Sequence, residues 1–206
     1  MTGIDALAVP WSTLWQPTLT FVTLVFLVLP SQRLARGWQL ALLVGLSALA
    51  LLPIDGIALA IYLRSVIDDL AITTVMVLSL ATLVRLKLLT APPRLQQTEL
   101  LCLFAALALL LYPASLGLTY FDPYRLGYAP RPLLIVMGLL TLMLLWRRNL
   151  IGVLLLSIAT LTFSLKLKQS ENYWDYLIDP GLGTWAIIVL LMRSGLPVIA
   201  ARYRKA

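Results

Sequence analysis

Seven apolar runs separated by short polar gaps constrain the fold of this 206-residue chain more than any other feature. A helix that spans a bilayer needs about 20 mostly apolar residues, with about 17 as the practical minimum. Hydrophobic residues make up 61% of the chain and charged residues only 12%, which is more apolar surface than one soluble core of this size can bury. We therefore predict an all-α integral membrane protein. The predicted transmembrane helices are approximately 14–30, 37–53, 69–86, 99–113, 132–147, 149–166 and 182–200.

The gaps between these runs are too short to hold a soluble core of their own. Proline and glycine residues lie at or between most of the predicted helix ends, as is usual for helix boundaries. Several runs are shorter than an ideal crossing, but interfacial Trp, Tyr, Lys and Arg side chains extend such segments into the headgroup layer. The sequence thus predicts a single polytopic membrane domain over 1–206, a compact bundle of about seven helices.

The charge of the gaps alternates along the chain and predicts its orientation. Eleven of the sixteen Lys and Arg residues lie in alternate gaps and in the C-terminal tail, together with one acidic residue, Glu99. The other gaps contain five cations and eight acidic residues. By the positive-inside rule, the N-terminus faces outward and the C-terminus faces the cytoplasm. Six crossings would follow instead if the last run, interrupted by Arg193, lay on the membrane surface.

The first predicted outer loop, residues 52–70, is too apolar for a solvated turn, so we predict a short interfacial helix within it. Arg64 and Asp68 are four residues apart, a spacing that favours an ion pair on one helix face. Asp69 then begins the third crossing, where a carboxylate favours a helix N-terminus. The functional alternative is a carboxylate at the mouth of a polar pocket.

The second outer loop places aromatic residues around Asp122 and Arg125. An aromatic belt at the membrane interface explains this density. Alternatively, a sugar or lipid headgroup could stack on the tyrosines while Arg125 holds a phosphate. The aromatic residues are Tyr112, Tyr120, Phe121, Tyr124 and Tyr128.

In the third outer loop, Glu171, Asp175 and Asp179 recur every four residues and would line one stripe of a helix. We favour the interpretation that this stripe is the wet face of an amphipathic interfacial helix that ends at Pro180. The alternative is a divalent cation held by three carboxylates. The neighbouring aromatic side chains would point elsewhere; they are Tyr173, Trp174 and Tyr176.

The chain lacks the residues that common catalytic sites require. It has no histidine, one cysteine, and no GxSxG, P-loop or HExxH motif. We therefore predict no catalytic residues, no metal and no cofactor. The cations flank apolar runs and do not alternate with aromatic residues, so we expect no nucleic-acid partner.

The favoured function is a non-catalytic accessory, assembly or scaffold subunit of a cell-envelope system in the plasma membrane, a bacterial inner membrane. Besides the lipid bilayer, it would recognise a membrane or envelope protein through its outer loops. Two alternatives stay open: a small carrier for a cation or small solute, and an enzyme that acts on a lipid or lipid-linked sugar. The candidate ligand or partner residues are Arg64, Asp68, Asp69, Asp122, Tyr124, Arg125, Glu171, Tyr173, Trp174, Asp175 and Asp179.

Overall fold

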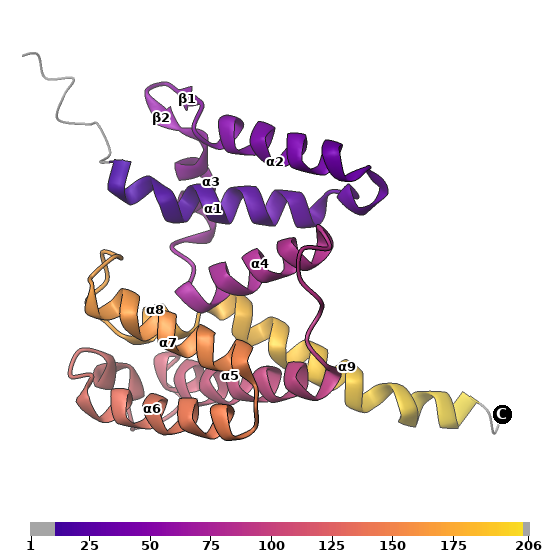
Figure 1. Cartoon of the computed structure of the whole chain (residues 1–206). Coiled ribbons are helices and arrows are strands. Elements are labelled where there is room, and N and C mark those ends of the chain that lie inside the picture. The colour runs from indigo at the N-terminus through magenta and orange to yellow at the C-terminus, as the bar shows by residue number, and fades with distance from the viewer. Residues whose placement is uncertain (1–10, 204–206) are drawn as a thin grey trace, which may run out of the picture. The chain divides into compact units, whose positions relative to one another are not determined.

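A computed structural model of the chain describes the backbone of residues 11–203 and the side chains of residues 14–195. Apart from one short hairpin, its regular elements are helical, which confirms the predicted all-α class (Figure 1). Each of the seven apolar runs coincides with a helix to within a few residues. The helices are α1 (Trp11–Val28), α2 (Arg36–Ala50), α3 (Leu59–Ile67), α4 (Ile72–Arg85), α5 (Arg94–Ser115), α6 (Arg131–Trp146), α7 (Leu150–Ser164), α8 (Trp174–Leu177) and α9 (Pro180–Tyr203).

The helices differ in how well their length and composition suit a membrane crossing. Within the described residues, α5 alone is both long and apolar enough to cross a membrane. The number of crossings therefore stays a prediction. Five apolar helices are shorter; they are Leu14–Val28, Arg36–Ala50, Ile72–Arg85, Arg131–Trp146 and Leu150–Ser164.

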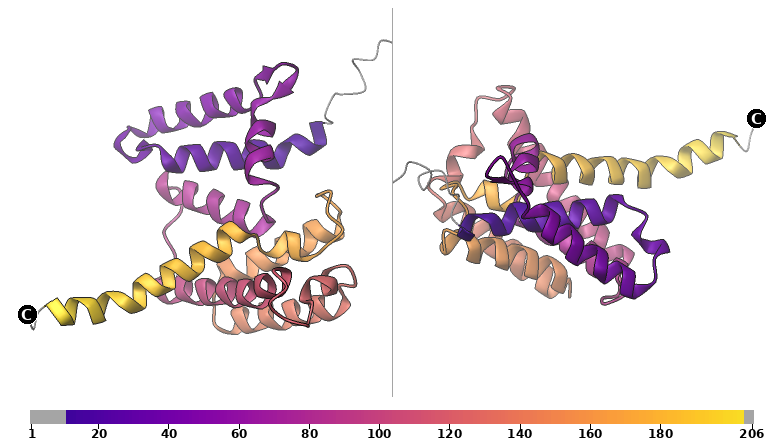
Figure 2. Two further views of the ribbon diagram at one scale, coloured as in Figure 1. Left: turned by 180° about the vertical axis from the view of Figure 1, so that it is seen from behind. Right: turned by 90° about the horizontal axis from the view of Figure 1, so that it is seen from above.

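Contacts between residues divide the chain into two compact units (Figure 2). Unit 1 contains the described residues up to Leu70 together with Thr74–Ala91. Unit 2 contains Ala71–Thr73 and the chain from Pro92 onward. The boundary crosses the start of α4, so the first residues of this helix belong to unit 2 and the rest of it to unit 1.

In unit 1, α1 packs against α2 and α3 around an apolar core. Phe26 of α1 is completely buried, next to Leu46 of α2 and Ala60 of α3. Arg85, in the last turn of α4, closes the C-terminal end of α1: its Nη1 donates to the carbonyl oxygens of Phe26 (3.2 Å) and Leu27 (2.6 Å). These last carbonyls of a helix have no partner within it, so the cation satisfies them.

The first predicted outer loop begins with a hairpin in which β1 (Pro53–Ile54) pairs with β2 (Ile57–Ala58). Asp55 and Gly56 form its two-residue turn, and both have positive φ angles (50° and 82°). This is the backbone that tight two-residue hairpins require. Helix α3 follows directly, which confirms the short helix predicted between residues 52 and 70; its placement at an interface stays a prediction.

In unit 2, α5 packs against α9, and α6 packs against α7. Small residues set how closely α5 and α9 approach each other. A Cβ atom on Gly183 of α9 would lie 2.6 Å from the Cβ of Ala108 on α5. Such small-residue contacts let two helix backbones come together and are common where helices associate in membranes.

Four helices end in the same hydrogen-bonded motif. After α6, for example, the Asn149 N–H donates to the Leu144 carbonyl (2.8 Å) and the Arg148 N–H donates to the Leu145 carbonyl (2.9 Å). This pair of bonds is the Schellman motif, whose first residue beyond the helix cap adopts the left-handed conformation and is usually glycine. Here it is glycine once, at Gly117 after α5. The other three are cationic: Lys87 after α4, Arg148 after α6 and Lys166 after α7.

Candidate functional site

The second and third of the predicted outer loops come together in unit 2, where the short turn η3 (Pro123–Gly127) packs against the segment before α8. The Tyr173 N–H donates to the Gly127 carbonyl (3.1 Å), and the Trp174 indole Nε1 donates to the Pro123 carbonyl (2.8 Å). The Asn172 amide Nδ2 donates to the Tyr124 carbonyl (3.1 Å). These three bonds fasten segments that lie about fifty residues apart in the chain.

The aromatic side chains of the third loop form the interior of this junction. Tyr173, Trp174 and Tyr176 are at most 1% exposed. The Phe163 ring of α7 lies 4.8 Å from the Tyr173 ring and 5.2 Å from the Tyr176 ring, measured between centroids. The Tyr173 hydroxyl lies 2.5 Å from Thr160 Oγ1 of the same helix. The predicted amphipathic helix is therefore wrong, because the aromatic residues supply the core that the loop folds around.

Asp175 lies inside the junction, half-buried, and not on a wet helix face. Its two carboxylate oxygens accept hydrogen bonds from the Tyr124 hydroxyl at 3.1 and 3.2 Å, and Oδ2 also accepts one from the Ser170 hydroxyl. The Lys168 ammonium donates to the Asp175 carbonyl (3.0 Å). Burial, and then the charge of Asp175, raise the pKa of Tyr124, so this phenol stays protonated and keeps its donor role.

Asp179 is buried and joins two backbone segments of unit 2. Its Oδ2 accepts from the Ala71 N–H (2.9 Å), and its Oδ1 accepts from the Leu182 N–H (2.8 Å). The second bond makes Asp179 the N-cap of α9. Pro180 therefore begins α9 and does not end the preceding helix as predicted, because proline fits the first helical position, where no N–H is needed.

The three carboxylates of this loop do not form the predicted stripe. Helix α8 is only Trp174–Leu177, so Glu171 and Asp179 lie outside it. Glu171 is exposed, whereas Asp175 and Asp179 have separate protein donors. In the part of the chain that the structure describes, no group of three or more His, Cys, Asp or Glu residues is placed to hold a metal ion.

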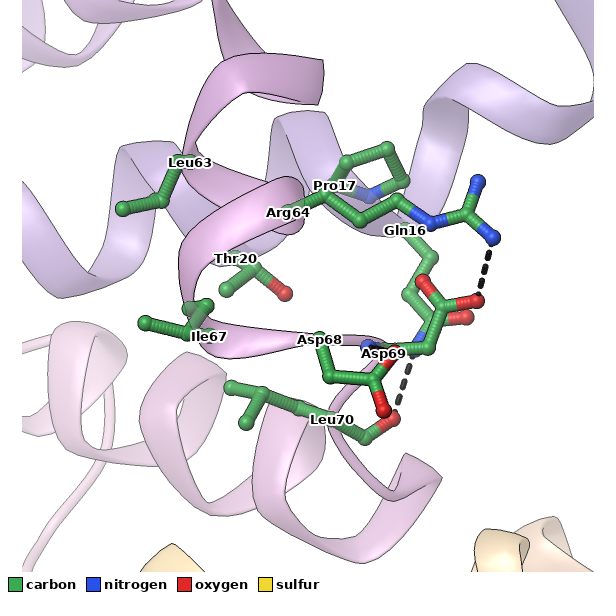
Figure 3. Close-up of a pocket in the computed structure, with 9 residues that line it drawn as sticks. All are labelled: Gln16, Pro17, Thr20, Leu63, Arg64, Ile67, Asp68, Asp69 and Leu70. Atoms are coloured by element: carbon green, nitrogen blue, oxygen red, sulfur yellow. Dashed lines mark hydrogen bonds and ion pairs between the residues drawn. The ribbon is translucent and has the colours of Figure 1, made fainter.

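In unit 1, the predicted ion pair forms with a different partner. Arg64 Nη2 lies 2.6 Å from Asp69 Oδ2, not beside Asp68 (Figure 3). Helix α3 ends at Ile67, and Asp68 then takes a positive φ of 62°, which removes it from the face that carries Arg64. Asp68 Oδ1 instead accepts from the Asp69 N–H (2.7 Å).

The cavity beside this ion pair is small. Its lining includes Gln16 and Thr20 of α1, and its volume of about 10 Å³ is the space of a single water molecule. Gln16 Nε2 crosses it to donate to the Leu70 carbonyl (2.6 Å) (Figure 3). Arg64 and Asp69 therefore form an ion pair beside a water-sized cavity, and Asp68 is exposed next to them, so these residues do not line the mouth of a ligand-sized pocket.

The two remaining candidate residues of the second loop, Asp122 and Arg125, have different surroundings. Asp122 caps η3, because its Oδ1 accepts from the Tyr124 N–H (3.0 Å). Arg125 is exposed. The side chains that project most from this loop are large and apolar or aromatic; they are Leu116, Leu118, Tyr120, Phe121 and Tyr128.

Sequence reasoning missed Gly127, Ser170 and Asn172, which hold the junction together. Asn172 Oδ1 accepts from the N–H of Trp174, and Ser170 Oγ accepts from the N–H of Asn172, both at 3.0 Å. Such bonds to the backbone two residues on are typical of Asn and Ser in turns. The Ser-x-Asn-x-Trp spacing therefore indicates a turn at residues 170–174. No sequence pattern indicates that Gly127 lies against Asn172 and Trp174.

Comparison of the chain with protein-family models, curated proteins and solved structures finds no match.

Proposed function

We propose that this chain is a non-catalytic accessory or assembly subunit of a cell-envelope system, a seven-crossing protein of a bacterial inner membrane with its N-terminus outside. In this proposal the outer loops recognise a membrane or envelope protein. The observation that carries the membrane placement is the apolar surface of the helices. The observation that favours a binding role over catalysis is that carboxylates of the outer loops are bound by hydrogen-bond donors of the protein itself.

The helices expose more apolar surface than water tolerates. On α6 alone, Ile135, Leu139 and Leu142 are 66%, 62% and 62% exposed. Similar exposed leucine, isoleucine and valine side chains occur on α2, α5, α7 and α9. Contiguous exposed apolar patches of this kind mark membrane or protein contacts, and lipid covers them on all sides in a bilayer.

The shorter helices can cross the bilayer because side chains at their ends anchor them in the headgroup layer. A 15-residue helix such as α2 or α7 is about 22 Å long, against about 30 Å of hydrocarbon. Local thinning of the bilayer and anchoring side chains accommodate such a mismatch at modest cost. Exposed Trp38 at the start of α2 and exposed Trp146 at the end of α6 are side chains of the type that anchors helix ends.

The outer-loop carboxylates support a structural role for the loops. Asp69, Asp175 and Asp179 each bind donors of the protein itself. The second loop also exposes an apolar tip, which we define as Leu116, Leu118, Tyr120 and Phe121. Aromatic residues of this kind are enriched at protein interfaces. Since the predicted outer gaps are net acidic, the fitting partner offers an apolar pocket with a basic rim.

Cysteine labelling tests the placement of the chain. In a Cys102→Ser background, Ala129→Cys and Ala91→Cys form a matched pair, because both alanines are exposed in loops. A membrane-impermeant maleimide applied to intact cells is expected to label Ala129→Cys, and to label Ala91→Cys only after permeabilisation. The reverse pattern would contradict the orientation, and a chain recovered without detergent in the soluble fraction would contradict membrane residence.

Removing the apolar tip tests the recognition role. The double variant Tyr120→Ser, Phe121→Ser is expected to lower the amount of any stoichiometric partner that co-purifies in mild detergent at least five-fold, because truncating an aromatic hot spot of an interface costs about 2 kcal/mol or more. Trp38→Ser, which removes an exposed aromatic residue at a predicted cytoplasmic helix end, is the control and should leave the partner bound. Equal recovery with the double variant would count against the tip as the docking surface.

A further inference from the structure

Arginines from three elements of unit 2 surround the first turn of α5. Arg94 begins this helix, Arg148 follows α6, and Arg193 lies on α9; all three are exposed. The Arg193 guanidinium donates to Gln97 Oε1 and to Thr98 Oγ1, both at 2.9 Å. On the other side, Gln96 Nε2 donates to the Arg148 carbonyl (3.1 Å). The Arg193 guanidinium and the Arg148 backbone are thus tied to the first turn of α5, in which Arg94 itself lies. We call Arg94, Arg148 and Arg193 the arginine cluster.

Glu99, the acidic residue of this helix turn, is already paired. Glu99 Oε1 accepts from Arg147 Nε (2.9 Å) and Nη2 (2.7 Å), and Glu99 Oε2 accepts from Nδ2 of the buried Asn149 (3.0 Å). Within residues 14–195, neither Arg94 nor Arg148 nor Arg193 has a carboxylate within ion-pair distance. The arginine cluster therefore presents positive charge that the described part of the chain does not compensate.

Exposed apolar side chains border the arginine cluster. Leu95 follows Arg94, and Trp146 and Leu150 flank the turn that contains Arg148; their exposed fractions are 65%, 83% and 62%. Cations directly beside apolar and tryptophan side chains match the boundary between lipid headgroups and acyl chains. A small soluble anion would make no favourable contact with these apolar side chains.

We propose that the arginine cluster binds the phosphate group of an anionic phospholipid in the cytoplasmic leaflet, with the acyl chains against Leu95 and Leu150. The proposal rests on the membrane orientation given under the proposed function. Guanidinium groups bind phosphate oxygens in pairs and are the preferred side chains for this geometry. Pro93 supplies no capping side chain to α5, so the positive end of this helix adds to the attraction.

Lipid retention by the full-length purified chain tests this site. Protein in mixed micelles with phosphatidylglycerol or phosphatidylcholine is examined by native mass spectrometry for bound lipid. We expect the wild type to retain phosphatidylglycerol at least ten-fold more than phosphatidylcholine. In the triple variant Arg94→Gln, Arg148→Gln, Arg193→Gln this preference should disappear, because each cation near an anionic lipid surface contributes about a five-fold change in affinity.

A matched triple variant removes the same charge elsewhere: Arg33→Gln, Arg36→Gln, Arg131→Gln, all exposed. It should retain phosphatidylglycerol within two-fold of the wild type. An equal loss in both variants would overturn the site, since net charge alone would then explain binding. Inorganic phosphate that abolishes lipid retention at equal concentration would assign the cluster to free phosphate and overturn the lipid proposal.

Membrane residence is measured separately, by extraction of the chain from membranes with and without detergent. A chain that needs detergent but shows no lipid preference overturns the arginine cluster as a lipid site and leaves the proposed function standing. A chain that is soluble without detergent overturns both. Circular dichroism of the two triple variants confirms that each keeps its helices before retention is compared.

Discussion

Replacing Gly127 with alanine is expected to lower the free energy of unfolding by about 3 kcal/mol, as the new methyl group has no room and cannot push its neighbour aside. A Cβ at this position would overlap Asn172 Oδ1 and lie 2.9 Å from Trp174 Cδ1. Asn172 is completely buried, and both ends of its amide are hydrogen-bonded. Any movement that admits the methyl group breaks these bonds or separates η3 from the third loop.

Thermal or denaturant unfolding in mild detergent measures this effect, and Gly138→Ala is the control. Gly138 lies on α6, and a methyl group there would have no atom within 4 Å outside its own helix, so alanine should be neutral or stabilise by up to about 1 kcal/mol. If Gly127→Ala were as stable as Gly138→Ala, the close contact between the second and third loops would not exist.

Replacing Asp179 with alanine is expected to cost a similar amount, about 3 kcal/mol, because two backbone donors lose a charged acceptor at once. The N–H groups of Ala71 and Leu182 would both be left without their partner in a buried place. The variant Asp179→Asn distinguishes the contributions of the two hydrogen bonds. Its oxygen can still cap α9 through Leu182, but its amide then places a donor against the Ala71 N–H, so an intermediate loss is expected.

Unfolding in detergent checks this order, alanine least stable and asparagine between alanine and wild type. Glu171→Gln, which neutralises an exposed carboxylate of the same loop, serves as the control and should change the unfolding free energy by less than about 0.5 kcal/mol. Asp179→Ala and Glu171→Gln with equal stability would contradict the capping role of Asp179.

The positions of the helices could be predicted because hydrophobic runs define them whether lipid or protein covers the surface. The predicted run 132–147 became α6, Arg131–Trp146, and the run 149–166 became α7, Leu150–Ser164. Proline and glycine at the ends also carry local information. Pro130 and Pro132, for example, lie where α6 begins and suit the first turn of a helix.

The structure of the third predicted outer loop could not be read from the sequence, because the hydrogen bonds that shape this loop are not local. The spacing of Glu171, Asp175 and Asp179 suggested a helix, yet the Asp175 carboxylate binds Tyr124, 51 residues away, and Asp179 binds Ala71, 108 residues away. Burying three aromatic side chains gains more than exposing them on a short helix. The carboxylates are consequently turned inward, toward donors that no pattern in the loop itself reveals.

In the first loop, the predicted partner of Arg64 was also wrong, because the backbone does not continue as a helix through the predicted pair. A spacing of four residues predicts a partner only as long as the helix continues, and α3 stops one residue before Asp68. The charge of Arg64 then meets Asp69. The residue types of the ion pair were correct, and the end of the helix decided which acid was used.

At Lys87 after α4 and Arg148 after α6, two requirements act on the same residue: the left-handed backbone favours glycine, and the proposed membrane orientation favours a positive charge. Glycine at Lys87 or Arg148 would relieve a backbone penalty of about 1 kcal/mol. In the orientation we propose, it would also delete a charge that keeps these turns in the cytoplasm. Sequence drift at these two positions should therefore favour lysine, arginine and, less often, asparagine, and exclude the residue that the local backbone alone would select.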